Sequence, residues 1–238
     1  MPSTIATFIA HPGEFFERRV ARLSGPRGAG VATALSLAST LAIGAIMWLF
    51  SRRFTGTTTI DNPDYPGDQF CEGELSVTPA GCDQPATQTV EVSSLLWEEI
   101  GGILPIAFVG LLVLWVALAV ALHIGASLAD ADGRIGQTLE VAAWGFVPTV
   151  VTTVVGGAAL VAFAAQADLS TGDPETLLTS VEAIRTGVSG LTLQGIQLAG
   201  AAWQAYVWAA GLRVVHDISR AAAVTTAAVT AAVPVLLG

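Results

Sequence analysis

Long runs without a charged residue alternate with short charged stretches along this chain. The uncharged runs cover residues 28–51, 100–129, 141–167, 186–212 and 221–238. About twenty helical residues cross the roughly 30 Å hydrocarbon core of a bilayer, so the first four runs are long enough to span it and the fifth is marginal. The pattern predicts an all-α integral membrane protein, a bundle of about five transmembrane helices.

The ends of these runs give the expected order of spans and loops. The spans are expected at 29–50, 100–127, 140–165, 191–212 and 221–238, and the segments before and between them at 1–28, 51–99, 128–139, 166–190 and 213–220. Residues 25–28 are expected to be flexible, because they contain two glycines and a proline.

Two prolines fall inside the expected spans. Pro105 lies in the first turns of the second span, where a missing backbone donor does least damage. Pro148 removes a hydrogen bond within the third span and predicts a kink there. The residues available to satisfy the freed carbonyl groups are Thr149, Thr152 and Thr153.

The N-terminal segment carries an amphipathic pattern. Phe16, Val20 and Leu23 recur at helical spacing opposite charged residues, which predicts a helix that starts after Pro12. Two interpretations stay open. The helix lies on the cytoplasmic membrane surface as an interfacial anchor, which the pattern favours, or it docks a protein partner.

Arginine positions predict the orientation, because short basic loops stay in the cytoplasm. With the N-terminus inside, seven of the ten basic residues fall in cytoplasmic segments and three fall outside. We therefore expect a multi-pass protein of the plasma membrane with a cytoplasmic N-terminus and an extracytoplasmic C-terminus.

The 51–99 segment is too polar for lipid. Its prolines and the alternation of residues 87–92 predict a small extracytoplasmic cap of turns and strands. Cys71 and Cys82, the two cysteines of the chain, both fall in it. An oxidising compartment favours a disulfide between them over two free thiols, and the bridge would stabilise the cap by about 3 kcal/mol. All three histidines lie elsewhere, so the cysteines lack the partners of a metal site.

The overall composition excludes several classes of function. The chain is 53% hydrophobic, 12% charged and carries a net charge of -9, with no lysine. The acidic excess resembles that of a halophilic, archaeal-like protein and argues against nucleic-acid binding. The absence of lysine excludes a P-loop and a Schiff-base lysine, so we expect neither nucleotide hydrolysis nor a cofactor of that kind.

Four polar side chains within the expected spans are candidate functional positions: His123, Gln194, Gln197 and Gln204. Two interpretations stay open for them. The glutamines can line a path or ligand site for a small solute, or they form hydrogen bonds between helices, which we favour because His123 is the only ionisable residue among them.

Enzyme motifs do not assemble in this sequence. Ser189, in a Gly-Val-Ser-Gly stretch, resembles the nucleophile loop of rhomboid proteases, but His216 lies past the far end of the same expected helix and His123 is most of a bilayer away. Residues 130–133 resemble part of a calcium loop, but leucines occupy the first and last ligand positions. We therefore expect no enzyme active site and no metal site.

Three short motifs, in order along the chain, resemble the prokaryotic branch of the Yip-type family, the small five-span proteins named for interacting with Ypt/Rab GTPases. They are Pro12-Gly13-Glu14-Phe15-Phe16; the stretch from Gly133 to Val141 with Trp144 and Pro148; and Trp208, Gly211, Leu212, His216, Ser219 and Ala221. The resemblance implies a non-enzymatic scaffold or accessory subunit that contacts the lipid bilayer and other membrane proteins or itself through helix faces. The alternative is a small-solute transporter or channel.

Overall fold

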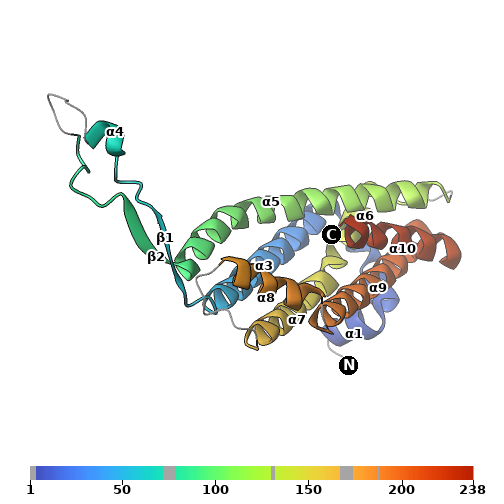
Figure 1. The fold of residues 1–238 in the computed structure, drawn as a ribbon. Helices are drawn as coiled ribbons and strands as arrows, with labels where there is room; N and C mark the ends of the chain where they lie inside the picture. Colours follow the sequence, from blue (N-terminus) through green and yellow to red (C-terminus); the bar gives the residue numbers. More distant parts are fainter. Residues whose placement is uncertain (1–3, 72–78, 130–131, 167–173, 187, 238) are drawn as a thin grey trace.

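The computed structural model describes residues 4–71, 79–129, 132–166, 174–186 and 188–237. They are mostly helical, and Figure 1 shows long helices gathered into a bundle from which a small hairpin projects. In chain order the elements are α1 (Thr4–Ala10), α2 (Pro12–Glu17), the 3-10 helix η1 (Val20–Arg22), α3 (Gly25–Ser51), β1 (Thr57–Asp61), α4 (Asp68–Cys71), β2 (Thr87–Glu91), α5 (Val92–Ser127), α6 (Ile135–Trp144), α7 (Phe146–Ala164), α8 (Pro174–Thr186), α9 (Val188–His216) and α10 (Arg220–Leu237).

Among the described residues, three stretches of helix are long and apolar enough to cross a membrane: α3, α5 and the α6–α7 pair. The sequence predicted about five such stretches. α9 is long but less apolar, because three glutamines lower its hydropathy, and α10 offers the shorter apolar stretch Arg220–Val233. Spanning by α9 and α10 stays a prediction.

The outer surface of the bundle is apolar along these helices. Leu41 on α3 is 65% exposed, and Ile106 and Val113 on α5 are 71% and 63% exposed. A continuous apolar surface of this kind is unfavourable in water and favourable in lipid. The exposed face therefore agrees with lipid as the solvent of these helices.

The helix α3 starts earlier than the sequence indicated. Residues 25–28, expected to be flexible, form its first turn, with Pro26 where a missing donor costs nothing. A Cβ atom on Gly28 would lie 2.7 Å from the backbone nitrogen of Glu140. Glycine at this position therefore lets α3 and α6 approach closely.

The helix α5 also starts earlier, at Val92 instead of residue 100, directly after β2. Glu98 and Glu99 lie on it with exposed side chains, so their charges are compatible with a helix that begins outside the membrane. Pro105 consequently lies well inside the helix instead of in its first turns.

The third expected span is two helices. The break falls at Gly145, between α6 and α7, because Pro148 has no N–H to donate to the carbonyl oxygen of Trp144, four residues earlier. The helix is therefore interrupted one turn before Pro148, where the sequence predicted a kink. The Thr152 hydroxyl donates to the carbonyl oxygens of Pro148 and Thr149, at 3.0 and 3.1 Å, and not to the carbonyl that the proline leaves free.

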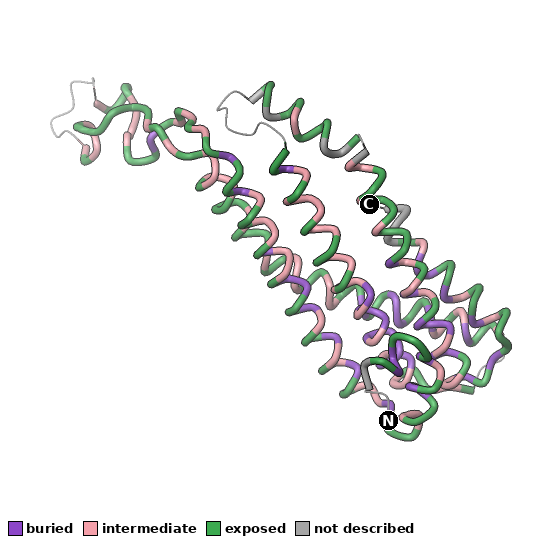
Figure 2. Tube along the Cα trace, turned by 90° about the horizontal axis from the view of Figure 1, so that it is seen from below, coloured by how far each residue is buried: buried purple, intermediate pink, exposed green. Residues whose placement is uncertain are grey.

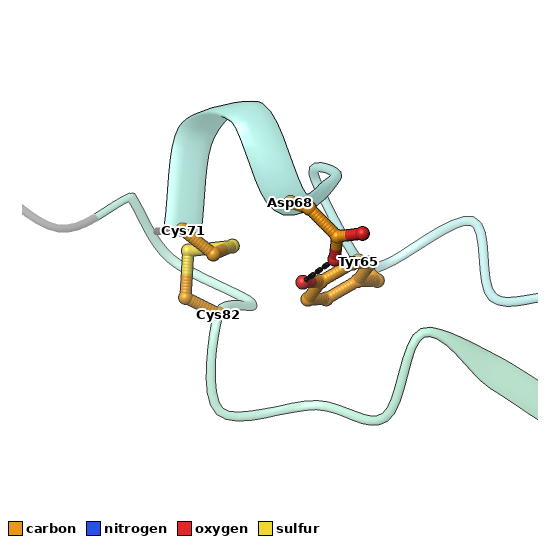
Figure 3. The surroundings of a disulfide bond; sticks show 4 residues. All are labelled: Tyr65, Asp68, Cys71 and Cys82. Carbon is orange, nitrogen blue, oxygen red and sulfur yellow. Dashed lines mark hydrogen bonds between the residues drawn. A yellow bond between two sulfur atoms is a disulfide. The ribbon is translucent and has the colours of Figure 1, made fainter. Parts of the chain in front are cut away.

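The polar segment between α3 and α5 forms a hairpin closed by a disulfide. Strands β1 and β2 pair antiparallel, with Thr57 opposite Glu91. Cys71 and Cys82 are joined, with their Cα atoms 5.3 Å apart, and Figure 3 shows the Tyr65 hydroxyl hydrogen-bonded to Asp68 beside the bridge. The disulfide expected from the sequence is thus present, and the strand expected at 87–92 is β2.

The segment expected as a loop at 166–190 contains a helix. Residues 167–173 lie outside the described residues, but α8 covers Pro174–Thr186 and α9 already begins at Val188. Its polar composition made the segment look like a loop, although a helix can form with most of its side chains exposed, as in α8, where Leu178 is 71% exposed.

The buried core lies at one end of the bundle. Figure 2 shows buried residues concentrated at the end where the N-terminus lies. The core joins α1, α2, α3, α5, α6, α7, α9 and α10, and its fully buried large side chains include Phe16, Leu122, Val141, Phe146, Trp208 and Leu212. This end of the molecule is therefore fixed by packing between segments far apart in the sequence.

Candidate functional site

The short helix α6 is the centre of this packed end, which we call the α6 junction (α2, α6, the ends of α5 and α9, and the start of α10). Two tryptophans hold α6 through their indole N–H groups. Trp115 of α5 donates to the carbonyl oxygen of Leu139 at 3.0 Å, and Trp208 of α9 donates to that of Ala142 at 3.2 Å. Buried donors that find such partners fix the position of one helix against its neighbours.

Close packing at the α6 junction depends on glycines that face large side chains. A Cβ atom on Gly145 would lie 1.9 Å from the indole nitrogen of Trp208. One on Gly211 would lie 2.5 Å from Val141 and 3.1 Å from Phe16. All three distances are shorter than van der Waals contact, so these two positions admit no larger residue without movement of their neighbours.

The N-terminal segment packs into the α6 junction instead of presenting its apolar face to lipid. It is α1, α2 and η1 in place of one helix, and Phe15 and Phe16 are 3% and 0% exposed. The Phe15 ring meets Trp144 edge to face, with centroids 4.9 Å apart, and the Arg19 guanidinium lies 4.1 Å from the Phe15 centroid. The amphipathic pattern thus reflects docking onto the chain's own helices, an interpretation that the sequence did not offer.

Two histidines and a threonine form a polar cluster inside the α6 junction. The Thr138 hydroxyl lies 3.3 Å from Nδ1 of His123 and 2.8 Å from Nε2 of His216. Thr138 is fully buried and His216 is 3% exposed. From the sequence we grouped His123 with the three glutamines of the fourth span, and nothing local to it indicated Thr138 or His216 as neighbours.

The environment of His216 favours its neutral form. It lies past the apolar part of α9, and burial, followed by the nearby charge of His123, lowers the pKa of His216 below its ordinary value of 6.5. Its Nδ1 atom has no hydrogen-bond partner among the described residues. Gly133 packs against the ring, since a Cβ there would lie 2.2 Å from Nδ1.

A buried carboxylate joins α6 to the start of α3. Glu140 is 5% exposed, and its Oε2 accepts a hydrogen bond from the backbone N–H of Ser24 at 2.7 Å. Ser24 immediately precedes α3, so the negative charge lies at the positive end of that helix. From the sequence, Glu140 was the expected start of a span and part of the Gly133–Val141 motif, and neither indicated this contact with Ser24.

The three glutamines of α9 do not form one site with His123. Gln194 and Gln197 are exposed, whereas Gln204 is 8% exposed and donates to the Thr149 hydroxyl of α7 at 3.4 Å. The Gln204 contact is the interhelical hydrogen bond that we favoured from the sequence. A pocket of about 430 Å³ between α3, α7 and α9 includes Gln197 but none of the other three polar residues.

The remaining motifs lie apart from one another. Ser189 is near the start of α9 and His216 is its last residue, so the helix separates them. Asp130 and Ala131 of the calcium-loop resemblance lie outside the described residues, and the described part of the chain contains no group of three potential metal-ligating side chains.

A family model described as the Yip1 domain matches residues 6–238 of the chain. Searches of curated proteins and of solved structures return no significant match. The family match includes the N-terminal segment, α6 and the α9–α10 turn, which are the segments that the three sequence motifs had indicated. The resemblance stated from those motifs is therefore confirmed for the family.

Proposed function

Because the chain belongs to the Yip1 domain family and is a membrane protein, we propose that it acts without enzymatic chemistry, as a scaffold or accessory subunit for other membrane proteins. The supporting observation is the use of the motif residues. Pro12, Phe15, Phe16, Pro148, Gly211 and His216 are buried, and Gly133 packs on His216. Buried side chains of this kind fix how the helices pack against one another. Helices packed in this way present a defined surface to partner proteins.

The α6 junction gathers the segments that we expect partners to contact. The expected cytoplasmic segments 1–28, 128–140 and 213–220 meet there, since Gly25 contacts Gly136 and His216 contacts Gly133. We propose that the chain lies in the plasma membrane, with the α6 junction in the cytoplasm and the disulfide-closed hairpin on the outer side. The arginine distribution and the disulfide support this orientation.

Co-purification from native membranes in mild detergent tests the scaffold role. We expect the tagged full-length chain to recover specific membrane proteins. The variant Phe8→Ala/Phe15→Ala, which removes the aromatic contacts of the N-terminal segment with Trp144, should recover less of them. The control Ile103→Ala/Ile106→Ala changes two exposed side chains of α5 away from the α6 junction. A wild-type chain purified only as a partner-free monomer would contradict the proposal.

Solute transport is the second candidate function, because the pocket between α3, α7 and α9 is lined by Gln197 and three threonines of α7. Proteoliposome swelling measures it. If the pocket conducts, Gln197→Leu should slow swelling, and Gln194→Leu, which lies outside the pocket lining, should not. Equal swelling of protein-containing and empty liposomes would eliminate this candidate and leave the scaffold role.

A further inference from the structure

A second groove, of about 600 Å³, lies between α2, α9 and α10 on the outside of the α6 junction. We call it the α9–α10 groove. Four charged side chains line it: Glu17, Arg213, Asp217 and Arg220. The sharp turn between α9 and α10 places the two arginines in one groove although seven positions separate them in the sequence.

The four charged side chains do not neutralise one another through ion pairs. No ion pair within the described residues joins any of them to another charged side chain, and all four residues are exposed. Exposed arginines in a concave site are available to a ligand, and the guanidinium group is well suited to bind phosphate oxygens in pairs.

The remaining lining is apolar and open to the side. Ala209, Ala210 and Val214 contribute to the groove, as do Tyr206 and Val224, which are 51% and 47% exposed. The α6 junction is the end of the bundle where α3 begins and α5 ends. The charged side chains of the groove can contact a polar headgroup, and the neighbouring apolar surface of the helices can contact an apolar chain. The groove therefore suits an amphipathic ligand.

We propose that the α9–α10 groove binds the headgroup of a membrane phospholipid, with Arg213 and Arg220 on the phosphate. Glu17 and Asp217 would disfavour a ligand that carries only negative charge. They fit a headgroup that also has hydrogen-bond donors, such as an ammonium or hydroxyl group. The apolar chains of the lipid then follow Tyr206 and Val224 along the outside of α9 and α10.

Native mass spectrometry of the purified full-length chain tests the arginines. The probes are phosphatidylethanolamine and phosphatidylglycerol, which carry donors, and phosphatidylcholine, which carries none. We expect the first two to bind more tightly than the third, and Arg213→Gln/Arg220→Gln to weaken their binding about tenfold or more. The control Arg18→Gln/Arg22→Gln removes two exposed arginines outside the groove and should leave binding unchanged. Equal loss in both variants, or no loss in the groove variant, would overturn the assignment.

Two further arms test the acids and the source of the phosphate. Glu17→Gln/Asp217→Asn should abolish the preference for phosphatidylethanolamine over phosphatidylcholine while binding itself persists; an unchanged preference would refute the role of the acids. Soluble phosphoethanolamine supplies the same headgroup without a lipid. If it binds and the phospholipids do not, the groove takes a free phosphate ester and the lipid proposal is wrong.

Discussion

At Gly211 a methyl group is already too large. Its Cβ would overlap Val141 and Phe16, whereas a Cβ on Gly195, on the same helix, meets nothing within 4 Å. We expect Gly211→Ala to lower the free energy of unfolding by about 1–3 kcal/mol. The control Gly195→Ala should raise it by roughly 0.5–1 kcal/mol, because alanine favours the helix. Thermal unfolding in detergent compares them, and equal effects would show that the α6 junction is less tightly packed than described.

His216 gives the stability of the α6 junction a pH dependence. Because the pKa of His216 is lowered in the folded chain, the unfolded chain takes up a proton at a higher pH than the folded one. The contribution of neutral His216 to the free energy of unfolding is therefore fully present above pH 6.5. It is lost as the pH falls from there through the lower pKa of His216 in the folded state.

Unfolding temperatures measured between about pH 8 and pH 5, on either side of the ordinary histidine value, check this dependence. The fall on acidification should be smaller in His216→Gln than in the wild type, and unchanged in His11→Gln, whose side chain is exposed. A wild-type profile that matches His216→Gln would show that protonation of His216 does not destabilise the fold.

At the scale of single residues, sequence reasoning identified His123, Phe16 and Gly211 but not their partners. Contacts such as His123 with Thr138, or Glu140 with the backbone of Ser24, join residues far apart along the chain. No local pattern specifies them, because they depend on how α3, α5, α6 and α9 pack. The Yip-type motifs marked three segments of this site without indicating that they meet.

The disulfide-closed hairpin is an element whose stability is separable from that of the bundle. We expect Cys71→Ser/Cys82→Ser to destabilise the hairpin by about 3 kcal/mol, since the bridge closes a loop with a sequence separation of 11 residues. Limited proteolysis should cut this variant faster within residues 57–91, while the thermal unfolding of the helices stays as in the wild type. Wild-type protein kept under reducing conditions is the matched control and should behave like the variant. Resistance equal to that of the oxidised chain would mean that the strand pairing alone holds the hairpin.

Helices could be predicted from the sequence where contact with lipid requires an uncharged run of residues. Uncharged runs located α3, α5 and α7, because a charged residue in the bilayer is costly. The same signal failed where a helix contains charged residues, so α5 starts eight residues before its expected beginning and α8 was taken for a loop. The break at Gly145 was expected from Pro148, but its position a turn earlier follows from the bond that proline cannot make.

In the whole molecule, α5 sets the distance between the disulfide-closed hairpin and the α6 junction. It has 36 residues and begins at the hairpin and ends at the α6 junction, so at about 1.5 Å per residue it extends over roughly 54 Å, more than the hydrocarbon core of a bilayer. The hairpin and the α6 junction must therefore face opposite sides of the membrane if α5 spans it. The scaffold role depends on this arrangement, because partners of the α6 junction are expected in the cytoplasm.

Labelling of single cysteines in intact cells tests that arrangement most directly. In a Cys71→Ser/Cys82→Ser background, Asp83→Cys places a thiol in the hairpin segment and Arg134→Cys places one at the start of α6, both at exposed positions. A membrane-impermeant maleimide should label the cysteine at position 83 in intact cells and the one at position 134 only after the cells are opened. Labelling of both positions in intact cells would contradict the account.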